Sequence, residues 1–287
     1  MNDLAKKEYW IWISQIKIGH TKIKRLLESF KDPERIYYAK EKELKKIKGI
    51  GKENIKNILN PYIKEKVYKD IEYMKENNIV IISVKDKEYP IKLKNIYDYP
   101  FCIYIKGNKN ILNDKCISII GCREYSKYGE KCAKYFSYNL AREGKVIVSG
   151  LAKGIDSFSH IGSIYAKGKT IAVVGNGLDT VYPKENTKLA EKIVGTGGAI
   201  ISEYPIGTKP LKMNFPARNR IISGISNSLI VIEAKKQSGT LITVDFALEQ
   251  GKDIYVVPGN IDSINSVGTN DLIKQGAILI TNYKEVL

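Results

Sequence analysis

Cys116-Ile-Ser-Ile-Ile-Gly-Cys-Arg-Glu-Tyr-Ser126 is an apolar run that ends in a glycine turn and leads into a helical pattern over residues 129–143. A short, β-branched apolar run bounded by a turn predicts a buried strand. Ser126 stands where a helix N-cap is expected. The stretch therefore predicts a strand–turn–helix unit, the building block of an α/β fold.

The same unit recurs on both sides of this stretch. The alternation predicts an α/β protein with a doubly wound, mostly parallel sheet, in which ligands bind at the carboxyl ends of the strands. The further strands expected are 79–84, 102–105, 145–148, 170–174, 199–202, 229–232, 253–257 and 278–280. The helices expected are 129–143, 155–167, 186–195, 238–251 and 269–275.

The N-terminal part follows a different pattern of short helices. Asp32-Pro33 marks a helix start, and Leu44–Ile55 reads as helix, Gly-Ile-Gly turn and helix, a helix-hairpin-helix element. We expect a small all-helical domain at 1–62 and the α/β domain at 63–287. The hairpin predicts either DNA contact through free helix N–H groups or a protein-docking module, and both alternatives stay open.

Charge favours a polyanionic partner. The chain has 47 Lys and Arg against 31 Asp and Glu, a formal net charge of +16. Residues 1–60 hold 15 basic and 8 acidic side chains. A lysine-rich composition accounts for part of this excess, and we attribute the remainder to an anionic ligand such as nucleic acid.

Several classes are disfavoured. Four cysteines without a C-x-x-C pair, and only two histidines, do not form a zinc pattern, so no metal is expected. The charged start Leu4-Ala5-Lys6-Lys7 does not resemble a signal peptide, and no apolar run approaches a membrane span. We expect a cytoplasmic protein with reduced thiols.

Four strand-to-helix junctions have residues suited to binding an anion. By topology they should meet at one edge of the sheet and form an anion-binding rim. They are Gly121–Ser126, Ser149–Asp156, Gly175–Asp179 and Gln237–Thr240.

The stretch Asn214-Phe-Pro-Ala-Arg-Asn-Arg-Ile-Ile-Ser-Gly224 brings a ring close to two guanidinium groups. A flat ring such as Phe215 can stack on an unpaired base, and Arg218 and Arg220 can hold phosphates. This combination points to nucleic acid.

Enzymatic motifs are poorly supported. No G-x-G-x-x-G follows the first strand of the α/β region, and Gly168-Lys169-Thr170 precedes a strand where a P-loop would follow one. His160 fits a structural histidine, and Glu203 and Glu233 fit anchors for arginines or loop amides better than an acid/base pair. We assign no catalytic residue and expect no cofactor.

The chain resembles the DNA-processing protein A family, also called DprA or Smf, in the order and spacing of seven sequence blocks. The resemblance covers roughly residues 79–287. The blocks are Gly121–Ser126, Ser149–Asp156, Gly175–Asp179 with Val181-Tyr182-Pro183, Ser202–Pro205, Phe215–Ser223, Ser238–Thr243 and Val257–Gly259.

The resemblance implies an extended Rossmann-like domain preceded by a sterile-alpha-motif-like helical domain. It also implies a homodimer, without enzymatic activity, that binds single-stranded DNA, protects incoming strands and helps load the RecA recombinase in natural transformation. Many family members carry a C-terminal winged-helix domain, which we do not expect here.

The family's binding residues carry over by position. Arg123 matches the arginine of the family's G-x-R-x-x-S motif, which contacts phosphate. Phe215 matches the aromatic residue whose ring contacts a base. Either Arg218 or Arg220 would instead pair with a carboxylate such as Glu203 or Glu233. The DNA-binding residues expected are Arg123, Ser126, Lys153, Lys212, Phe215, Arg218, Arg220, Ser238, Gly239 and Thr240.

The alternative function is a nucleotide-processing hydrolase. The expected fold also resembles lysine-decarboxylase-like phosphoribohydrolases, whose loop reads G-G-x-G-T-x-x-E. Thr243 stands at the position of that glutamate and cannot supply its carboxylate. The substitution favours the binding protein over the enzyme.

Overall fold

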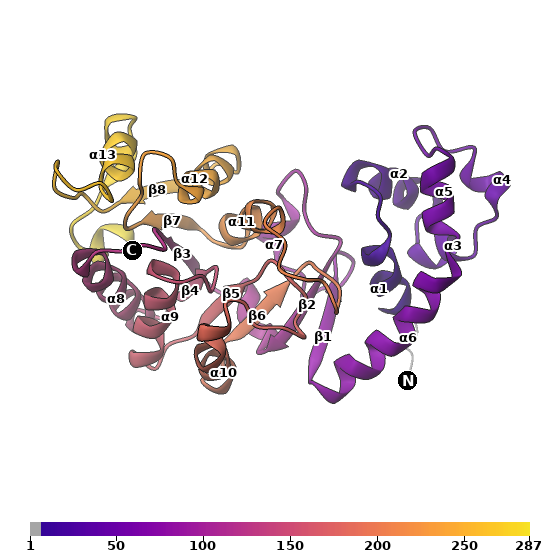
Figure 1. Cartoon of the computed structure of the whole chain (residues 1–287), viewed down its shortest axis with the longest axis horizontal. Coiled ribbons are helices and arrows are strands. Elements are labelled where there is room, and N and C mark those ends of the chain that lie inside the picture. The colour runs from indigo at the N-terminus through magenta and orange to yellow at the C-terminus, as the bar shows by residue number, and fades with distance from the viewer. Residues whose placement is uncertain (1–6) are drawn as a thin grey trace.

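The computed structural model describes residues 7–287 and shows a helical part joined to an α/β part (Figure 1). The helical part lies at one end of the molecule and the C-terminus at the other. Residues 1–6, which belong to the expected helical domain, lie outside the described residues. The N-terminal helices are α1 (Lys7–Gln15), α2 (His20–Phe30), α3 (Pro33–Tyr37), α4 (Glu41–Leu44), α5 (Lys52–Ile58) and α6 (Pro61–Glu76).

The expected signals in the helical part are in place. Asp32 caps α3 by accepting a hydrogen bond from the Glu34 N–H at 2.8 Å, and Pro33 is the first helical residue. The glycine turn separates α4 from α5, with Gly49 at φ +86° and Gly51 as the N-cap of α5.

The expected boundary at 62/63 falls in the first turn of α6, which runs through it without a break. Buried residues of α1 share one core with the neighbouring antiparallel strands β1 (Ile79–Ser83) and β2 (Cys102–Gly107). The hydroxyl of Ser14 on α1 and that of Tyr104 on β2 form a hydrogen bond at 2.7 Å. Within the helical part, Gln15 joins α1 to α6 by donating to Asp70 Oδ2 at 2.8 Å. The helical part is therefore packed against the sheet, and cutting it away would expose apolar surface.

The sheet is doubly wound and mostly parallel, which confirms the predicted fold class. Its nine strands lie in the order β1-β2-β6-β5-β4-β3-β7-β8-β9, and only the β1–β2 and β2–β6 pairs are antiparallel. The strands are β1 (Ile79–Ser83), β2 (Cys102–Gly107), β3 (Cys116–Ile120), β4 (Val146–Ser149), β5 (Thr170–Val173), β6 (Ala199–Ser202), β7 (Ser228–Val231), β8 (Asp253–Val256) and β9 (Ile278–Leu279).

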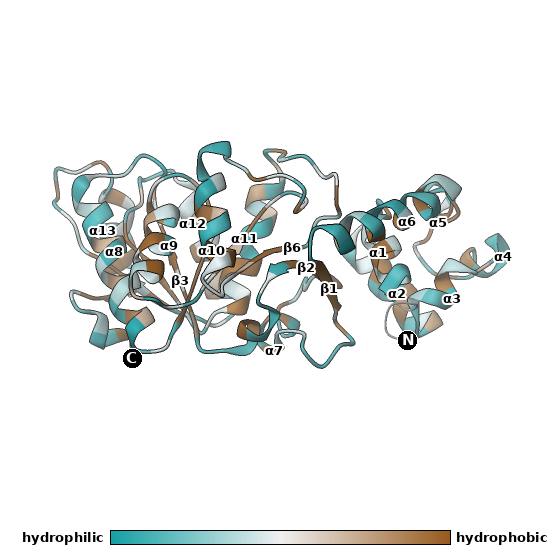
Figure 2. Ribbon diagram, turned by 90° about the horizontal axis from the view of Figure 1, so that it is seen from below, coloured by the Kyte–Doolittle hydropathy of each residue, from teal (hydrophilic) through white to brown (hydrophobic). Residues whose placement is uncertain are grey.

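Helices cover both faces of the sheet. Figure 1 shows α8, α9 and α10 on one face and α11, α12 and α13 on the other. Figure 2 shows strands such as β1, β2 and β6 in brown, between helices with much hydrophilic surface. The helices of the α/β part are α7 (Ile91–Lys94), α8 (Lys127–Arg142), α9 (Ile155–Tyr165), α10 (Thr187–Gly195), α11 (Asn214–Ile225), α12 (Gly239–Glu249) and α13 (Val267–Lys274).

The central strand β3 shows why both faces need cover. Ile117 and Ile119 belong to the apolar cluster that includes α8 residues, whereas Cys116 and Ile120 belong to the larger cluster on the opposite face. Ser118 lies between them and donates to the Ile222 carbonyl of α11 at 2.8 Å. This alternation follows from the period of two along a strand.

Two helices of the α/β part were not expected from the sequence, the short α7 and the longer α11. The block Asn214–Ile225 forms α11, with Pro216 in its first turn, where the missing N–H leaves no intrahelical bond unmade. In the described part of the chain, no helix combines the length and apolar character needed to cross a membrane.

His160 on α9 is fully buried and fits the expected structural role. Its Nδ1 lies 2.7 Å from the Thr170 hydroxyl, which itself donates to the Ile147 carbonyl at 2.7 Å. Because the hydrogen of that hydroxyl is engaged, the imidazole donates from Nδ1, and its buried Nε2 has no hydrogen-bond partner among the described residues. Burial, reinforced by the positive charge of Arg218, lowers the pKa of His160 from 6.5 to about 3.

We expect this histidine to destabilise the fold in acid. Between pH 6.5 and 3, His160 is protonated in the unfolded chain but not in the folded chain. Its contribution to the free energy of unfolding is therefore complete above pH 6.5 and decreases as the pH falls below that value. The loss should approach about 1.4 kcal/mol per pH unit. Urea unfolding at pH 7, 6 and 5 should show a shallower decline for His160→Gln. Equal slopes would contradict the assignment.

Candidate nucleic-acid site

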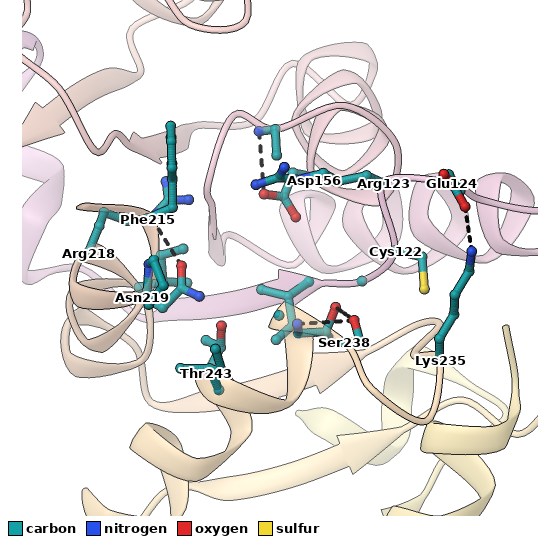
Figure 3. Close-up of a pocket in the computed structure, with 18 of the residues that line it drawn as sticks. Cys122, Arg123, Glu124, Asp156, Phe215, Arg218, Asn219, Lys235, Ser238 and Thr243 are labelled. Atoms are coloured by element: carbon teal, nitrogen blue, oxygen red, sulfur yellow. Dashed lines mark hydrogen bonds and ion pairs between the residues drawn. The ribbon is translucent and has the colours of Figure 1, made fainter. Parts of the chain in front are cut away.

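The site lies where the order of strands reverses. β3 and β7 are parallel neighbours, but the chain leaves β3 toward β4 and leaves β7 toward β8. The loops that follow them diverge, which opens a crevice at the carboxyl edge of the sheet. A cavity of about 550 Å³ lies there, with its walls built by those two loops, the loop after β4 and helix α11 (Figure 3).

The predicted rim is formed directly by three of its four loops. Gly121–Glu124, Ala152 with Asp156, and Gln237–Thr240 all line the cavity. The loop at Gly175–Asp179 does not. Gly175 instead lies against the ring of Phe215. A Cβ at this position would lie 3.2 Å from Cδ1 of that ring, so a larger residue would crowd it.

An aromatic and cationic cluster faces the cavity. The ring of Phe215, at the start of α11, is half-buried, and the exposed Arg123 guanidinium lies over it, 5.8 Å from the ring centroid. The ring of Tyr182, 43% exposed, lies 5.4 Å from Phe215 at an angle of 36°. Two neighbouring rings and a cation form a surface on which a planar base can stack.

Two cations at this cavity are available to a ligand. Arg123 and Lys212 are exposed and form no ion pair with the described residues around the site. In contrast, Lys235 is paired with Glu124, and Lys153 lies 2.5 Å from Glu185 outside the cavity wall. Lys153 is exposed. To contact a ligand at the rim, its ammonium group would have to leave Glu185.

Arg220 does not occupy the position expected for phosphate contact. Its guanidinium is 7% exposed and donates to both oxygens of Glu203 at 2.6 Å, while Nε lies 2.9 Å from Asp98 Oδ2. The carboxylates raise the pKa of Arg220 further above its ordinary value, despite the opposing effect of burial. Arg220 is the structural arginine that the sequence suggested, with Glu203 as its partner.

Arg218 is also a support for the site. It is 4% exposed, and its Nη1 donates to the Gly150 carbonyl at 2.7 Å and to the Val173 carbonyl. It thus joins α11 to the loop after β4 and to the end of β5. Burial lowers the pKa of Arg218 to about 10. The side chain contributes to the cavity wall, but its Nη1 is engaged by the two backbone carbonyls and its Nε donates to Asn219 Oδ1 at 3.1 Å.

Ser126 and Glu233 hold the loop that carries Arg123. The Ser126 hydroxyl caps α8 by accepting from the Gly129 N–H at 3.0 Å, and it donates to Glu233 Oε1 at 2.5 Å. Glu233 also accepts from the Ser126 N–H at 3.1 Å. Ser126 therefore positions the loop, and its hydroxyl is already engaged.

Asp156 anchors the second loop in a comparable way. Its Oδ2 accepts from the N–H groups of Gly150 and Ala152 at 3.2 and 3.4 Å. Burial raises the pKa of this carboxyl, partly offset by Arg218. The sequence placed Asp156 within the block Ser149–Asp156 but did not identify it as an anchor.

Ser238, Gly239 and Thr240 form the start of α12 at the cavity. Ser238 caps the helix by accepting from the Thr240 N–H at 3.2 Å, and no atom would lie within 4 Å of a Cβ at Gly239. The helix presents backbone N–H groups and the positive end of its dipole to the cavity, an arrangement that suits a phosphate.

The sequence did not identify two contributors to the site. Tyr182 was part of a recognised block, but nothing in its local pattern showed that its ring would approach Phe215, 33 residues further along the chain. Lys235 gave no signal because its pairing with Glu124 depends on two loops meeting across the crevice. Within residues 7–287, no group of three or more His, Cys, Asp or Glu side chains is arranged to hold a metal.

The fold and the site together define a Rossmann-like α/β protein whose cavity suits a polyanion that carries flat rings. The model of the DNA recombination-mediator protein A family matches residues 45–287. The chain therefore belongs to the DNA recombination-mediator protein A family, as the sequence blocks had predicted.

Curated relatives agree with this assignment. DNA processing protein DprA of Streptococcus pneumoniae R6 is 45% identical over 71% of this chain and 72% of its own length. Protein Smf of Synechocystis is 34% identical over 99% of this chain and 72% of its own length. Protein Smf of Escherichia coli K12 is 41% identical over 75% of this chain, and the match spans 58% of the E. coli protein.

Solved structures show the same architecture. DprA from S. pneumoniae superposes with a TM-score of 0.77 at 36% identity, covering 97% of this chain and 96% of that one. DprA from Helicobacter pylori, described for its unique single-stranded DNA binding mode, gives a TM-score of 0.65 at 30% identity over 72% of this chain and 93% of its own.

Proposed function

We propose that this chain binds single-stranded DNA in the cavity between β3 and β7 and acts as a recombination mediator. The observation that carries the proposal is the exposed Arg123 placed over the half-buried ring of Phe215, at the open mouth of the cavity. Family membership and the single-stranded DNA binding of the H. pylori relative support the same ligand.

Each part of the cavity has a role in this proposal. Phe215 and Tyr182 stack on bases, which only an unpaired strand offers. Arg123, Lys212 and the N-terminus of α12 hold phosphates, so affinity depends on salt. Arg218 and Arg220 act indirectly by fixing α11 and the neighbouring loops.

The cellular role in the proposal comes from the family. The chain, as a cytoplasmic homodimer, would protect incoming single strands and help load RecA during natural transformation. Light scattering checks the dimer. The RecA ATPase on DNA coated with a single-strand binding protein should rise when this chain is added, and no rise would remove RecA loading from the proposal.

The proposal assigns binding and no catalysis. Thr243, where related hydrolases have glutamate, lines the cavity and is 2% exposed. Asp156 is a carboxyl at the wall, but its Oδ2 is engaged by two backbone N–H groups. Release of ribose 5-phosphate from nucleoside monophosphates would overturn the assignment and support the hydrolase.

Fluorescence anisotropy of a labelled dT oligonucleotide tests the proposal directly. We expect binding that duplex competitor does not displace and that weakens with salt, with a slope of about −0.7 for each phosphate neutralised. Equal affinity for duplex would reduce the site to a general basic surface, and absence of binding would remove single-stranded DNA as its ligand.

A further inference from the structure

Helix α8 carries a continuous basic and aromatic stripe on its outer face. The helix has four basic residues and one acidic residue, and its apolar side chains Ala133, Phe136 and Leu140 are buried against the sheet. At about 100° per residue, the stripe occupies an arc of roughly 100° on the opposite side. The stripe consists of Lys127, Lys131, Lys134, Tyr135, Tyr138 and Arg142.

Most of the stripe is exposed, and four of its six side chains have no partner among the described residues. Tyr135 is 41% exposed and packs edge-on against Phe136 and Tyr283. Lys127, Lys131 and Arg142 are exposed and form no ion pair with the residues that the structure describes, whereas Lys134 pairs with Glu130. Tyr138 is 37% exposed and makes neither a ring contact nor a side-chain hydrogen bond with the described residues. Such surface is unusual for an ordinary solvated helix face, where both signs of charge alternate.

The stripe is continuous with the cavity. α8 begins directly after the loop that carries Arg123, as Figure 1 shows for β3 and α8. In that loop, Tyr125 packs edge-on against Phe158 with centroids 4.6 Å apart, and Lys134 of the stripe lies over the same ring at 4.9 Å. A chain of rings and cations thus leads from the cavity mouth onto α8.

We infer that the α8 stripe is a second contact surface for the same DNA strand, holding the nucleotides that leave the cavity. The inference rests on the proposed function. Cations spaced along the helix neutralise phosphates while Tyr135 and Tyr138 offer rings to unpaired bases, the combination used by sequence-independent single-strand sites. The helix has 16 residues and so is about 24 Å long, which adds several nucleotides to the site.

The test compares short and long oligonucleotides. We expect the triple variant Lys131→Ala, Tyr138→Ala and Arg142→Ala to bind a dT pentamer, the short probe of the cavity, as the unsubstituted chain does. Its affinity for a dT 25-mer should fall at least about tenfold, and its salt slope should shrink by about 1.4 because two phosphate contacts are lost.

A matched control also removes two cationic side chains and one tyrosine, at positions away from the stripe. Lys188 and Lys192 on α10 and Tyr97 before β2 are exposed, and Lys188→Ala, Lys192→Ala and Tyr97→Ala should leave the 25-mer affinity unchanged. The milder double variant Lys131→Gln and Arg142→Gln keeps the test valid if the triple variant melts early, since it should still reduce the salt slope.

The outcomes separate this inference from the proposed function. If the unsubstituted chain binds neither oligonucleotide, the proposed function fails. If it binds both, and the stripe variant matches the α10 control on the 25-mer, the stripe is not a DNA surface although the cavity still is. Loss of pentamer and 25-mer binding by the same factor would also overturn the inference, because the stripe would then act only through the cavity.

Discussion

The double replacement Arg123→Ala and Phe215→Ala is expected to lower the affinity for single-stranded DNA by at least about 100-fold, the largest effect that we expect on binding. The ring alone should account for about 5- to 150-fold, because a stacked base is lost. The guanidinium adds a phosphate contact whose loss also reduces the salt slope by about 0.7. Anisotropy with labelled dT at two salt concentrations measures both effects.

The two single variants should not be additive. Arg123 lies over the ring of Phe215, so removing either side chain also removes part of the other's environment. Phe215→Tyr keeps the ring and serves as the matched control, which should retain most of the affinity. If the double variant bound dT as well as this control, the cavity would not be the DNA site.

Replacing Gly154 by alanine is expected to destabilise the fold by about 2–5 kcal/mol and to weaken DNA binding as well. Gly154 has φ +81°, and a Cβ there would lie 2.4 Å from the Cys122 carbonyl oxygen and 2.6 Å from that of Arg123. Both neighbours are backbone atoms and cannot rotate away. The loop that carries Arg123 would have to move.

Gly197→Ala is the control for Gly154→Ala. Gly197 has nearly the same φ, +80°, but nothing lies within 4 Å of the added Cβ. It should therefore show only the backbone strain, about 1–2 kcal/mol, and leave DNA affinity unchanged. Urea unfolding and dT binding of both variants check this difference, and identical behaviour would mean that the contact between the two loops is unimportant.

The family and the fold class were predictable because their signals are local. Strands such as Cys116–Ile120 are short apolar runs bounded by turns, and the blocks lie in a recognisable order along the chain. The caps at Asp32 and Ser126 were visible for the same reason, since a cap and the N–H that it accepts lie within three residues of each other.

The site was only partly predictable from the sequence. Arg123, Lys212, Phe215 and the Ser238–Thr240 turn all line one cavity in the structure, and their contact with DNA stays a prediction. The sequence grouped Arg218 and Arg220 with them because they are neighbours on the chain. On α11 their side chains are buried, one against backbone carbonyls and the other against Glu203 and Asp98.

The sequence by itself determined the alternation of elements, the position of the glycine turns and the kinds of side chain at each turn. Only the tertiary structure decided which of those side chains remain free for a ligand. The sequence does not distinguish an arginine or lysine that is free from one that is paired, because the partner lies more than a dozen residues away. Examples are Glu203 for Arg220 and Glu124 for Lys235. The approach of the Tyr182 ring to Phe215 is likewise a long-range contact. Long-range packing, which no local pattern encodes, therefore selects the site from its candidates.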